Sequence, residues 1–152
     1  MRVFAVMVIA TALLGVGRAA GAAGPVDAAS GVIVHAECAP IVAPGRLRCD
    51  VAIRIAGDAK GALTLRWADV EVTAAPAFVV PLKGRIGPSD ATKRDADAWS
   101  FAFAVVARQA GEGDVALRTR VVLCEAGSCT PRIFEATARV VVGGEPLPAP
   151  PP

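Results

Sequence analysis

A period of two in the distribution of apolar residues constrains this chain more than any other feature of its sequence. From Arg46 to Ile55 every odd position is apolar and most even positions are polar, which is the alternation of a β-strand with one buried face. Similar alternation occurs in the ranges 31–37, 63–72, 78–82, 99–105, 115–123 and 134–142. We therefore predict an all-β chain: an immunoglobulin-like antiparallel β-sandwich of about eight short strands.

The alternation also predicts which side chains form the apolar faces. These residues are Leu47, Cys49, Val51, Ile53, Ile55, Leu63, Leu65, Trp67, Val70, Val72, Phe78, Val80, Leu82, Trp99, Phe101, Phe103, Val105, Val115, Leu117, Val121, Leu123, Phe134, Ala136, Ala138, Val140 and Val142. Glycine and proline turn signals separate the runs at 43–45, 57–58, 87–90, 111–114 and 143–144. The segment from Lys83 to Asp97 shows the weakest pattern, so it is predicted to be a surface loop.

The first residues predict export from the cytoplasm. Met1-Arg2 is a positive start, an apolar run extends from Val3 to Val16, and small residues follow from Ala19 to Gly24. This order is that of a secretory signal peptide, expected at 1–22 with cleavage after Ala22. The apolar run is shorter than the roughly 20 residues that a spanning helix needs. We expect no stable membrane insertion after cleavage, and a location in the periplasm or further outside the cell.

The remainder is predicted to be one sandwich domain at 28–143 followed by a proline-rich tail at 144–152, which cannot continue a strand ladder because proline has no N–H. Of the 16 basic residues, Arg2 and Arg18 lie in the predicted leader, and the chain has 14 acidic residues. The mature charge is therefore close to zero. A nucleic-acid-binding domain would show a basic surplus, so we expect no nucleic-acid partner.

The sequence offers few residues for enzymatic chemistry other than its cysteines. His35 is the one histidine, and a lone histidine on an early strand is typical of a surface residue. The carboxylates occupy outward strand positions and turns, where we expect solvated charge. A zinc site made of all four cysteines lacks the closely spaced pairs that such sites use. We expect neither a cofactor nor a bound metal.

The chain has 4 cysteines, Cys38, Cys49, Cys124 and Cys129, and an even number in an exported protein is expected to pair. Three connectivities are open, although proximity favours Cys38 with Cys49 and Cys124 with Cys129. Cys38 and Cys49 continue the inward faces of two neighbouring runs, so this pair is predicted to be structural. A bond there would stabilise the fold by roughly 3 kcal/mol in the chain-entropy model.

Cys124 and Cys129 lie in a different setting, because strand, tight loop and strand place them across the neck of a hairpin. A disulfide that closes so short a loop adds less stability, and an exposed one can be attacked by an outside thiolate. This favours a redox role for the pair.

The run Cys124-Glu-Ala-Gly-Ser-Cys129-Thr-Pro131, with the strand from Glu112 to Leu123 before it, resembles the cysteine hairpin in the N-terminal periplasmic domain of the thiol:disulfide interchange protein DsbD and its relatives. The resemblance implies partners of two kinds, a thioredoxin-like or membrane electron donor and periplasmic disulfide substrates. It also implies that Cys129 is the sulfur attacked and that Cys124 resolves the mixed disulfide. The chain contains no tyrosine, so an aromatic shield over the pair would come from Phe78 or Trp99.

Two hypotheses follow for the function. The first is a periplasmic thiol–disulfide exchange domain that works through Cys124 and Cys129 and has no cofactor of its own. The alternative is an immunoglobulin-like binding or structural module in which both disulfides are staples. In that case an apolar patch or a free edge strand would do the binding.

Overall fold

The fold was analysed in a computed structural model, which describes residues 26–27 and 31–143. The predicted signal peptide at 1–22 and the tail at 144–152 lie outside the described residues. Among residues that are described, no helix is long and apolar enough to cross a membrane.

The described chain forms ten strands and one short 3₁₀ turn, two strands more than the approximate count expected from the sequence. Their bounds are β1 Val26–Asp27, β2 Val32–Cys38, β3 Gly45–Ile55, β4 Leu63–Ala74, β5 Val79–Pro81, β6 Arg85–Ile86, η1 Pro88–Asp90, β7 Ala91–Arg94, β8 Ala98–Ala107, β9 Gly111–Glu125 and β10 Ser128–Val142.

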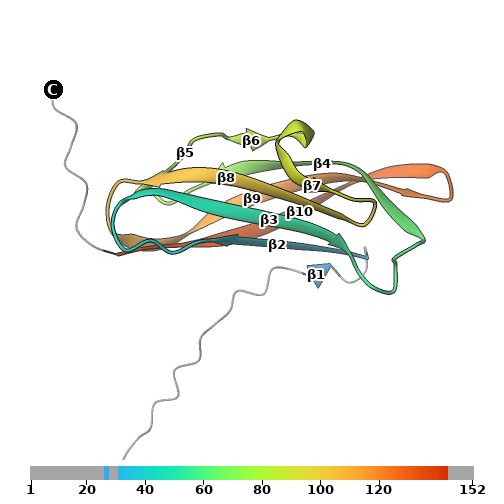
Figure 1. Ribbon diagram of the computed structural model, residues 1–152, viewed down its shortest axis with the longest axis horizontal. Helices are drawn as coiled ribbons and strands as arrows, with labels where there is room; N and C mark the ends of the chain where they lie inside the picture. The colour runs from blue at the N-terminus through green and yellow to red at the C-terminus, as the bar shows by residue number, and fades with distance from the viewer. Residues whose placement is uncertain (1–25, 28–30, 144–152) are drawn as a thin grey trace, which may run out of the picture.

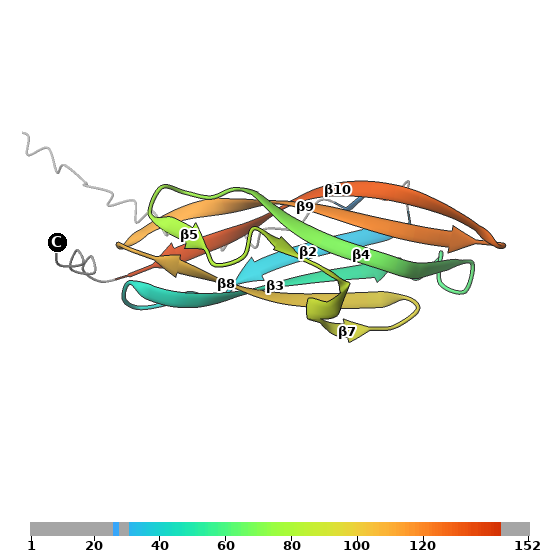
Figure 2. The ribbon, with the colours of Figure 1, turned by 90° about the horizontal axis from the view of Figure 1, so that it is seen from above.

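The strands pair into two antiparallel sheets that face each other, so the predicted sandwich is confirmed (Figures 1 and 2). One sheet has the order β1-β2-β3-β8-β5, with β7 also paired to β8, and the other has the order β10-β9-β4-β6. We call the second one the β10 sheet. Strands β2 and β10, from opposite layers, run along one edge of the molecule. The long β9–β10 hairpin extends along the whole β10 sheet.

The core lies between the sheets and is formed by the inward faces that the alternation predicted. The predicted inward residues of β3, β8, β9 and β10 are all buried. Val32, Val34 and Ala36 of β2 add to the same core. Strict alternation is therefore a reliable guide here, because each of these strands keeps one face against the opposite sheet along its length.

Strand β4 departs from the predicted pattern at Trp67. A β-bulge shifts the register between Leu65 and Trp67, and an extra residue of this kind reverses which face the following side chains occupy. Leu65 faces the core, and after the bulge Ala68 and Val70 face it. Trp67 therefore lies on the outer face and is only partly buried, so its predicted inward position is wrong.

The prediction for the run 78–82 is wrong by one residue. Val79 is buried, whereas Val80 and Leu82 are 36% and 52% exposed. The reason is that Val79 pairs with Ala107 at the edge of its sheet, which turns the odd-numbered residue inward. A run this short does not fix its own phase.

The segment from Lys83 to Asp97 is not the plain surface loop that was predicted. It contains β6, η1 and β7, and Ile86 is buried in the core. Likewise, the predicted turn at 111–114 is the start of β9. A Cβ atom built on Gly113 would lie 2.6 Å from Pro76 Cγ, so this glycine permits close packing rather than a turn.

Candidate functional site

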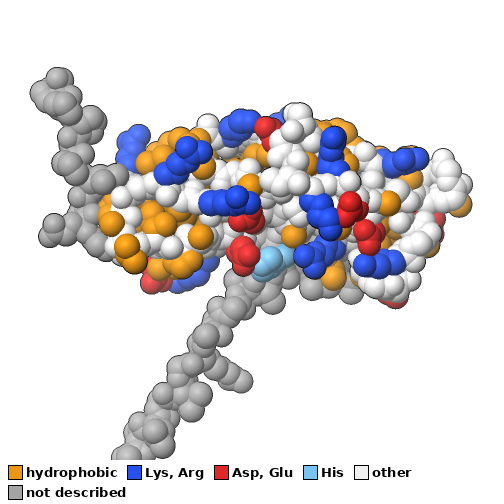
Figure 3. Space-filling model, in the orientation of Figure 1, with side chains coloured by type: hydrophobic (Ala, Val, Ile, Leu, Met, Phe, Trp, Pro, Cys, Tyr) orange, Lys and Arg blue, Asp and Glu red, His pale blue; other side chains and the backbone are white. Residues whose placement is uncertain are grey.

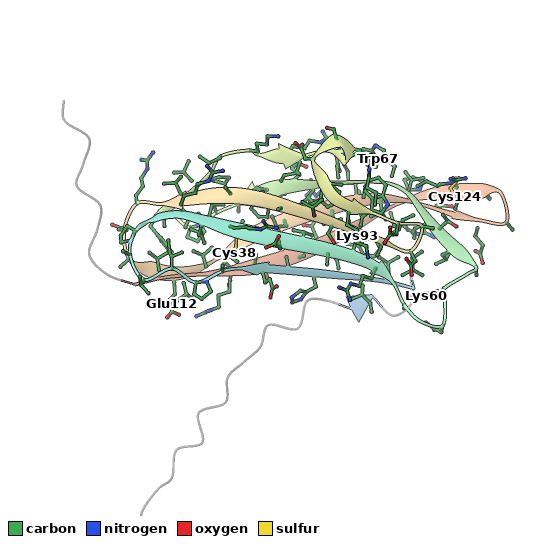
Figure 4. All side chains as sticks on the ribbon, in the orientation of Figure 1. Cys38, Lys60, Trp67, Lys93, Glu112 and Cys124 are labelled. Atoms are coloured by element: carbon green, nitrogen blue, oxygen red, sulfur yellow. A yellow bond between two sulfur atoms is a disulfide. The ribbon has the colours of Figure 1, made fainter. Side chains whose placement is uncertain are left out.

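Both predicted disulfides form, Cys38–Cys49 and Cys124–Cys129. Each joins two residues that are already directly opposite in an antiparallel ladder, and in each the Cα atoms are 4.0 Å apart. The two bonds lie on opposite layers, and Figure 4 shows Cys38 in the body of the sandwich and Cys124 near the end of the long hairpin.

The Cys38–Cys49 bond joins β2 to β3 within one sheet, at the base of a connection that touches the other sheet. Cys49 is fully buried in β3, and Cys38 is the last residue of β2. Just beyond it, Ile41 forms a parallel bridge with Val142 at the end of β10. The Ile41 N–H donates to the Val141 carbonyl at 3.1 Å, and the Gly143 N–H donates to the Ile41 carbonyl at 2.9 Å. The disulfide therefore anchors the β2–β3 connection, whose Ile41 links this sheet to β10 of the other sheet.

The Cys124–Cys129 bond lies one residue pair from the turn of the β9–β10 hairpin. The sequence suggested a four-residue connection, but β9 continues to Glu125 and β10 begins at Ser128. The turn is Ala126-Gly127, with φ values of 47° and 85°. Two positive φ angles characterise the type I′ turn, whose twist matches that of the flanking strands. Glycine adopts such angles without strain, but alanine does not.

The Cys124–Cys129 disulfide lies on the outer face of the β10 sheet and borders an open hollow of about 340 Å³. The other lining residues are Gly61, Ala62, Thr64, Arg66, Ala126 and Gly127. Cys129 is exposed and Cys124 is half-buried. The hollow thus gives solvent access to the disulfide, and a threonine and an arginine are among its lining residues.

Neither predicted aromatic shield lies over this disulfide. Trp99 is buried in the core on β8, where it packs against Phe101 with 6.1 Å between ring centroids. Phe78 packs against the start of β9, since a Cβ atom on Gly111 would lie 3.3 Å from its ring. That is the end of β9 far from the hairpin turn. Both candidates are therefore wrong as shields.

A buried carboxylate, Asp69, is a feature that the sequence analysis missed. Its side chain is 1% exposed on the outer face of the β10 sheet. Arg85 Nε donates to Asp69 Oδ2 at 2.7 Å, and Arg120 Nε donates to Asp69 Oδ1 at 2.9 Å. The hydrogen bond to Asp69 is the main cause that raises the pKa of Arg120 above its ordinary value. The Arg120 guanidinium carbon also lies 5.8 Å from the centroid of the Trp67 ring.

Other charged side chains lie exposed elsewhere on both sheets. Arg118 Nε donates to Glu135 Oε1 at 3.0 Å across β9 and β10, and Arg139 pairs with Glu112 farther along the same hairpin. His35 is exposed on β2, 3.5 Å from a Glu37 oxygen. Over the described residues, no three His, Cys, Asp or Glu side chains are grouped in a way that could hold a metal ion.

No protein-family model matches the sequence, and no curated protein matches it. Among solved structures, the fold is similar to AggA, the major subunit of aggregative adherence fimbriae type I from Escherichia coli, at 9% identity and a TM-score of 0.36, covering 73% of this chain and 95% of that one. It is also similar to the VesB protease of Vibrio cholerae, at 14% identity and a TM-score of 0.32, covering 73% of this chain and 32% of that one. The chain thus spans about a third of the protease's length. These TM-scores are too low to assign a family or a function.

Proposed function

We propose that the mature protein is an exported immunoglobulin-like binding module in which both disulfides are structural staples. The observation that carries this proposal is the placement of the two bonds. Each joins residues that already face each other in a ladder, one at the base of the β2–β3 connection that bridges to β10 and one near the turn of the longest hairpin. Bonds in such places hold strand ends that would otherwise fray.

The chain-entropy model gives the size of each effect. The cysteines are separated by 11 positions in Cys38–Cys49 and by 5 in Cys124–Cys129. The corresponding stabilisation is about 3 kcal/mol and about 2 kcal/mol. Both are useful fractions of a domain's total stability of roughly 5–15 kcal/mol. Paired cysteines also fit an oxidising compartment outside the cytoplasm.

Thiol–disulfide exchange at Cys124–Cys129 is a second candidate, favoured by the exposure of Cys129 beside the hollow. In that reaction the thiolate of a thioredoxin-like partner attacks Cys129 Sγ. The bond between the two sulfurs breaks and Cys124 leaves as a thiolate, for which Arg66, a residue lining the same hollow, is the candidate stabilising cation. When the partner's second thiol attacks the mixed disulfide, the partner is oxidised and the pair is reduced.

A redox titration of the mature protein separates the two candidates. The protein is equilibrated in glutathione buffers, its free thiols are alkylated, and the modified cysteines are identified by mass spectrometry. If both bonds resist reduction below about −300 mV, the staple function is supported. If Cys124–Cys129 is reduced near about −200 mV while Cys38–Cys49 resists, the pair exchanges with partners and the staple proposal is wrong for it.

A further inference from the structure

Strand β10 has one edge that pairs only in part. Its other edge is bonded to β9 from Ser128 to Val142. On the free edge, the Val141 carbonyl accepts from Ile41 and the Gly143 N–H donates to Ile41. Both groups belong to odd-numbered residues, and backbone groups alternate in direction along a strand. Odd-numbered residues of β10 therefore point their N–H and C=O groups to the free edge.

This phase defines the limits of the open edge. Ile41 occupies the edge at 141–143. Pro131 is odd-numbered, so its missing N–H falls on this edge and stops any further ladder there. Between these limits, the backbone groups of Ile133, Glu135, Thr137 and Arg139 have no strand partner within the described part of the chain.

The side chains along this stretch separate cleanly by face. Phe134, Ala136 and Ala138 are buried on the inner face. On the outer face Ile133 is 63% exposed, and Glu135 and Arg139 are exposed charges of opposite sign. Sheet edges are protected by prolines, bulges, charged side chains or a covering segment. Here Pro131 and Ile41 block the two ends, and the stretch between them carries charges of opposite sign.

We propose that this open edge pairs with the same edge of a second copy, in an antiparallel ladder with its two-fold axis at Ala136. This rests on the proposed binding function and names the partner. In that register Ile133 faces the partner's Arg139 and Glu135 faces the partner's Thr137, so the open stretch is used in full. The two β10 sheets then form one continuous sheet.

Two features of the ends fit this register. Pro131, which lacks a donor, lies beside the partner's Val141, whose carbonyl is already occupied by Ile41. One of the two hydrogen bonds between these residues is therefore impossible, so the ladder stops where it has the least to gain. At the axis Ala136 meets the partner's Ala136, and its small side chain lets the two strands approach closely. These matched ends favour a second copy over an unrelated peptide strand.

Charge along the edge is also self-complementary. Glu135 lies diagonally opposite the partner's Arg139, a contact that the two-fold axis repeats, and also diagonally opposite the partner's Glu135, so opposite-charge contacts outnumber like-charge contacts by two to one. Diagonal neighbours across a sheet lie within reach of long side chains. Within each copy Glu135 also pairs with Arg118 and Arg139 pairs with Glu112, both on β9, so each charge is shared between β9 and the partner's strand. Figure 4 labels Glu112 at the end of β9 far from the hairpin turn.

The first test changes one backbone donor on the edge. Analytical ultracentrifugation of the mature protein over about 1 μM to 1 mM is expected to show a dimer. Replacing Thr137 by proline removes an N–H from the open edge and none from the ladder with β9. Thr137→Pro is expected to raise the dissociation constant about tenfold or more. The matched control Thr137→Val keeps the N–H and is expected to retain the dimer.

A second test uses charge and does not depend on whether Thr137→Pro folds. Glu135→Arg alone and Arg139→Glu alone are each expected to weaken the homodimer. An equimolar mixture of the two variants is expected to associate, because every contact across the axis then joins opposite charges. The double variant Glu135→Arg/Arg139→Glu is expected to dimerise as well, although it loses the ion pairs with Arg118 and Glu112 inside each copy.

The outcomes separate this proposal from the function on which it rests. If the wild type stays monomeric at 1 mM, self-pairing is overturned. This holds also if the edge is found to bind a strand of another protein. A dimer that is indifferent to Thr137→Pro and to the charge exchange places the interface elsewhere and also overturns it. Neither result bears on the disulfides, whose staple role is decided by the redox titration alone.

Discussion

The buried carboxylate Asp69 makes the strongest prediction about stability. Asp69→Asn keeps the volume of the side chain but removes its charge, and its amide group presents N–H donors to two guanidinium groups. Removing one partner of a buried ion pair costs about 3–5 kcal/mol. Because Arg120 is 35% exposed and Arg85 is 54% exposed, solvent screens part of this loss. We expect a loss of about 3 kcal/mol, which lowers the melting temperature by about 10 °C.

The measurement is urea unfolding of the oxidised protein followed by circular dichroism, with thermal melting as a second probe. Glu71→Gln is the matched control, since it makes the same chemical change on the same strand without a buried ion pair, and it should cost less than about 0.5 kcal/mol. If Asp69→Asn loses no more than Glu71→Gln, the cluster does not stabilise the fold and the reasoning is refuted.

A double-mutant cycle apportions the effect between the two arginines. Arg120→Met and Arg85→Met are each combined with Asp69→Asn. Arg120 reaches both carboxylate oxygens, is less exposed and also contacts the Trp67 ring. Its coupling to Asp69 is expected to be about 2 kcal/mol, against about 1 kcal/mol for Arg85. The reverse order would contradict the geometry.

The remaining predictions concern the disulfides, the turn and one exposed pair. Cys38→Ser should lower the melting temperature more than Cys124→Ser, and equal losses would contradict the difference in closed loop length. Ala126→Asn should stabilise the fold by about 1 kcal/mol, because asparagine tolerates the positive φ of a type I′ turn; an unchanged melting temperature would count against the turn assignment. The hydrogen bond from Lys83 holds the pKa of Asp90 below its ordinary value. The ionised Asp90 therefore stabilises the fold fully at any pH above its pKa in the unfolded chain, and this stabilisation is lost as the pH falls through its pKa in the folded protein. Below pH 4 the unfolding curves of wild type and Asp90→Asn should therefore converge, whereas a constant gap between them would refute this.

The sequence was sufficient for the fold class because most strands keep one face buried along their whole length. In β3 the alternation of apolar residues from Leu47 to Ile55 predicts the buried face, and the predicted residues are buried in the structure. The cysteine pairing followed from the short distance along the chain within each pair. Both kinds of information are local, so they could be read without the tertiary structure.

Other features depend on contacts between distant segments. The bulge that turns Trp67 outward is a shift in the register between β4 and β9, so it cannot be read from β4 alone. Gly113 resembles a turn residue until Pro76 is seen to occupy the space that its side chain would need. Asp69 lies in the run Trp67-Ala68-Asp69-Val70, where a carboxylate between apolar neighbours hints at burial. Its partner Arg120 is 51 positions away, so nothing local could identify it.

The exposed surface was also beyond prediction. Figure 3 shows Lys and Arg side chains spread over one face of the sandwich, with acidic side chains among them. The sequence counts these charges but does not place them. Glu135 and Arg139 lie two residues either side of Thr137 on one exposed strand face. This spacing suggests strand pairing only when the free edge of β10 is known.

The bridge between Ile41 and Val142 has a mechanical consequence. A pulling force applied at Gly143 acts along the axis of β10, whereas the hydrogen bonds to β9 are perpendicular to the strands. Such a load stretches many bonds at once instead of opening them one after another. The Cys38–Cys49 bond lies close behind the bridge and is covalent, so β2 cannot separate from β3 at the loaded end. The domain is therefore built to resist tension at its C-terminal end.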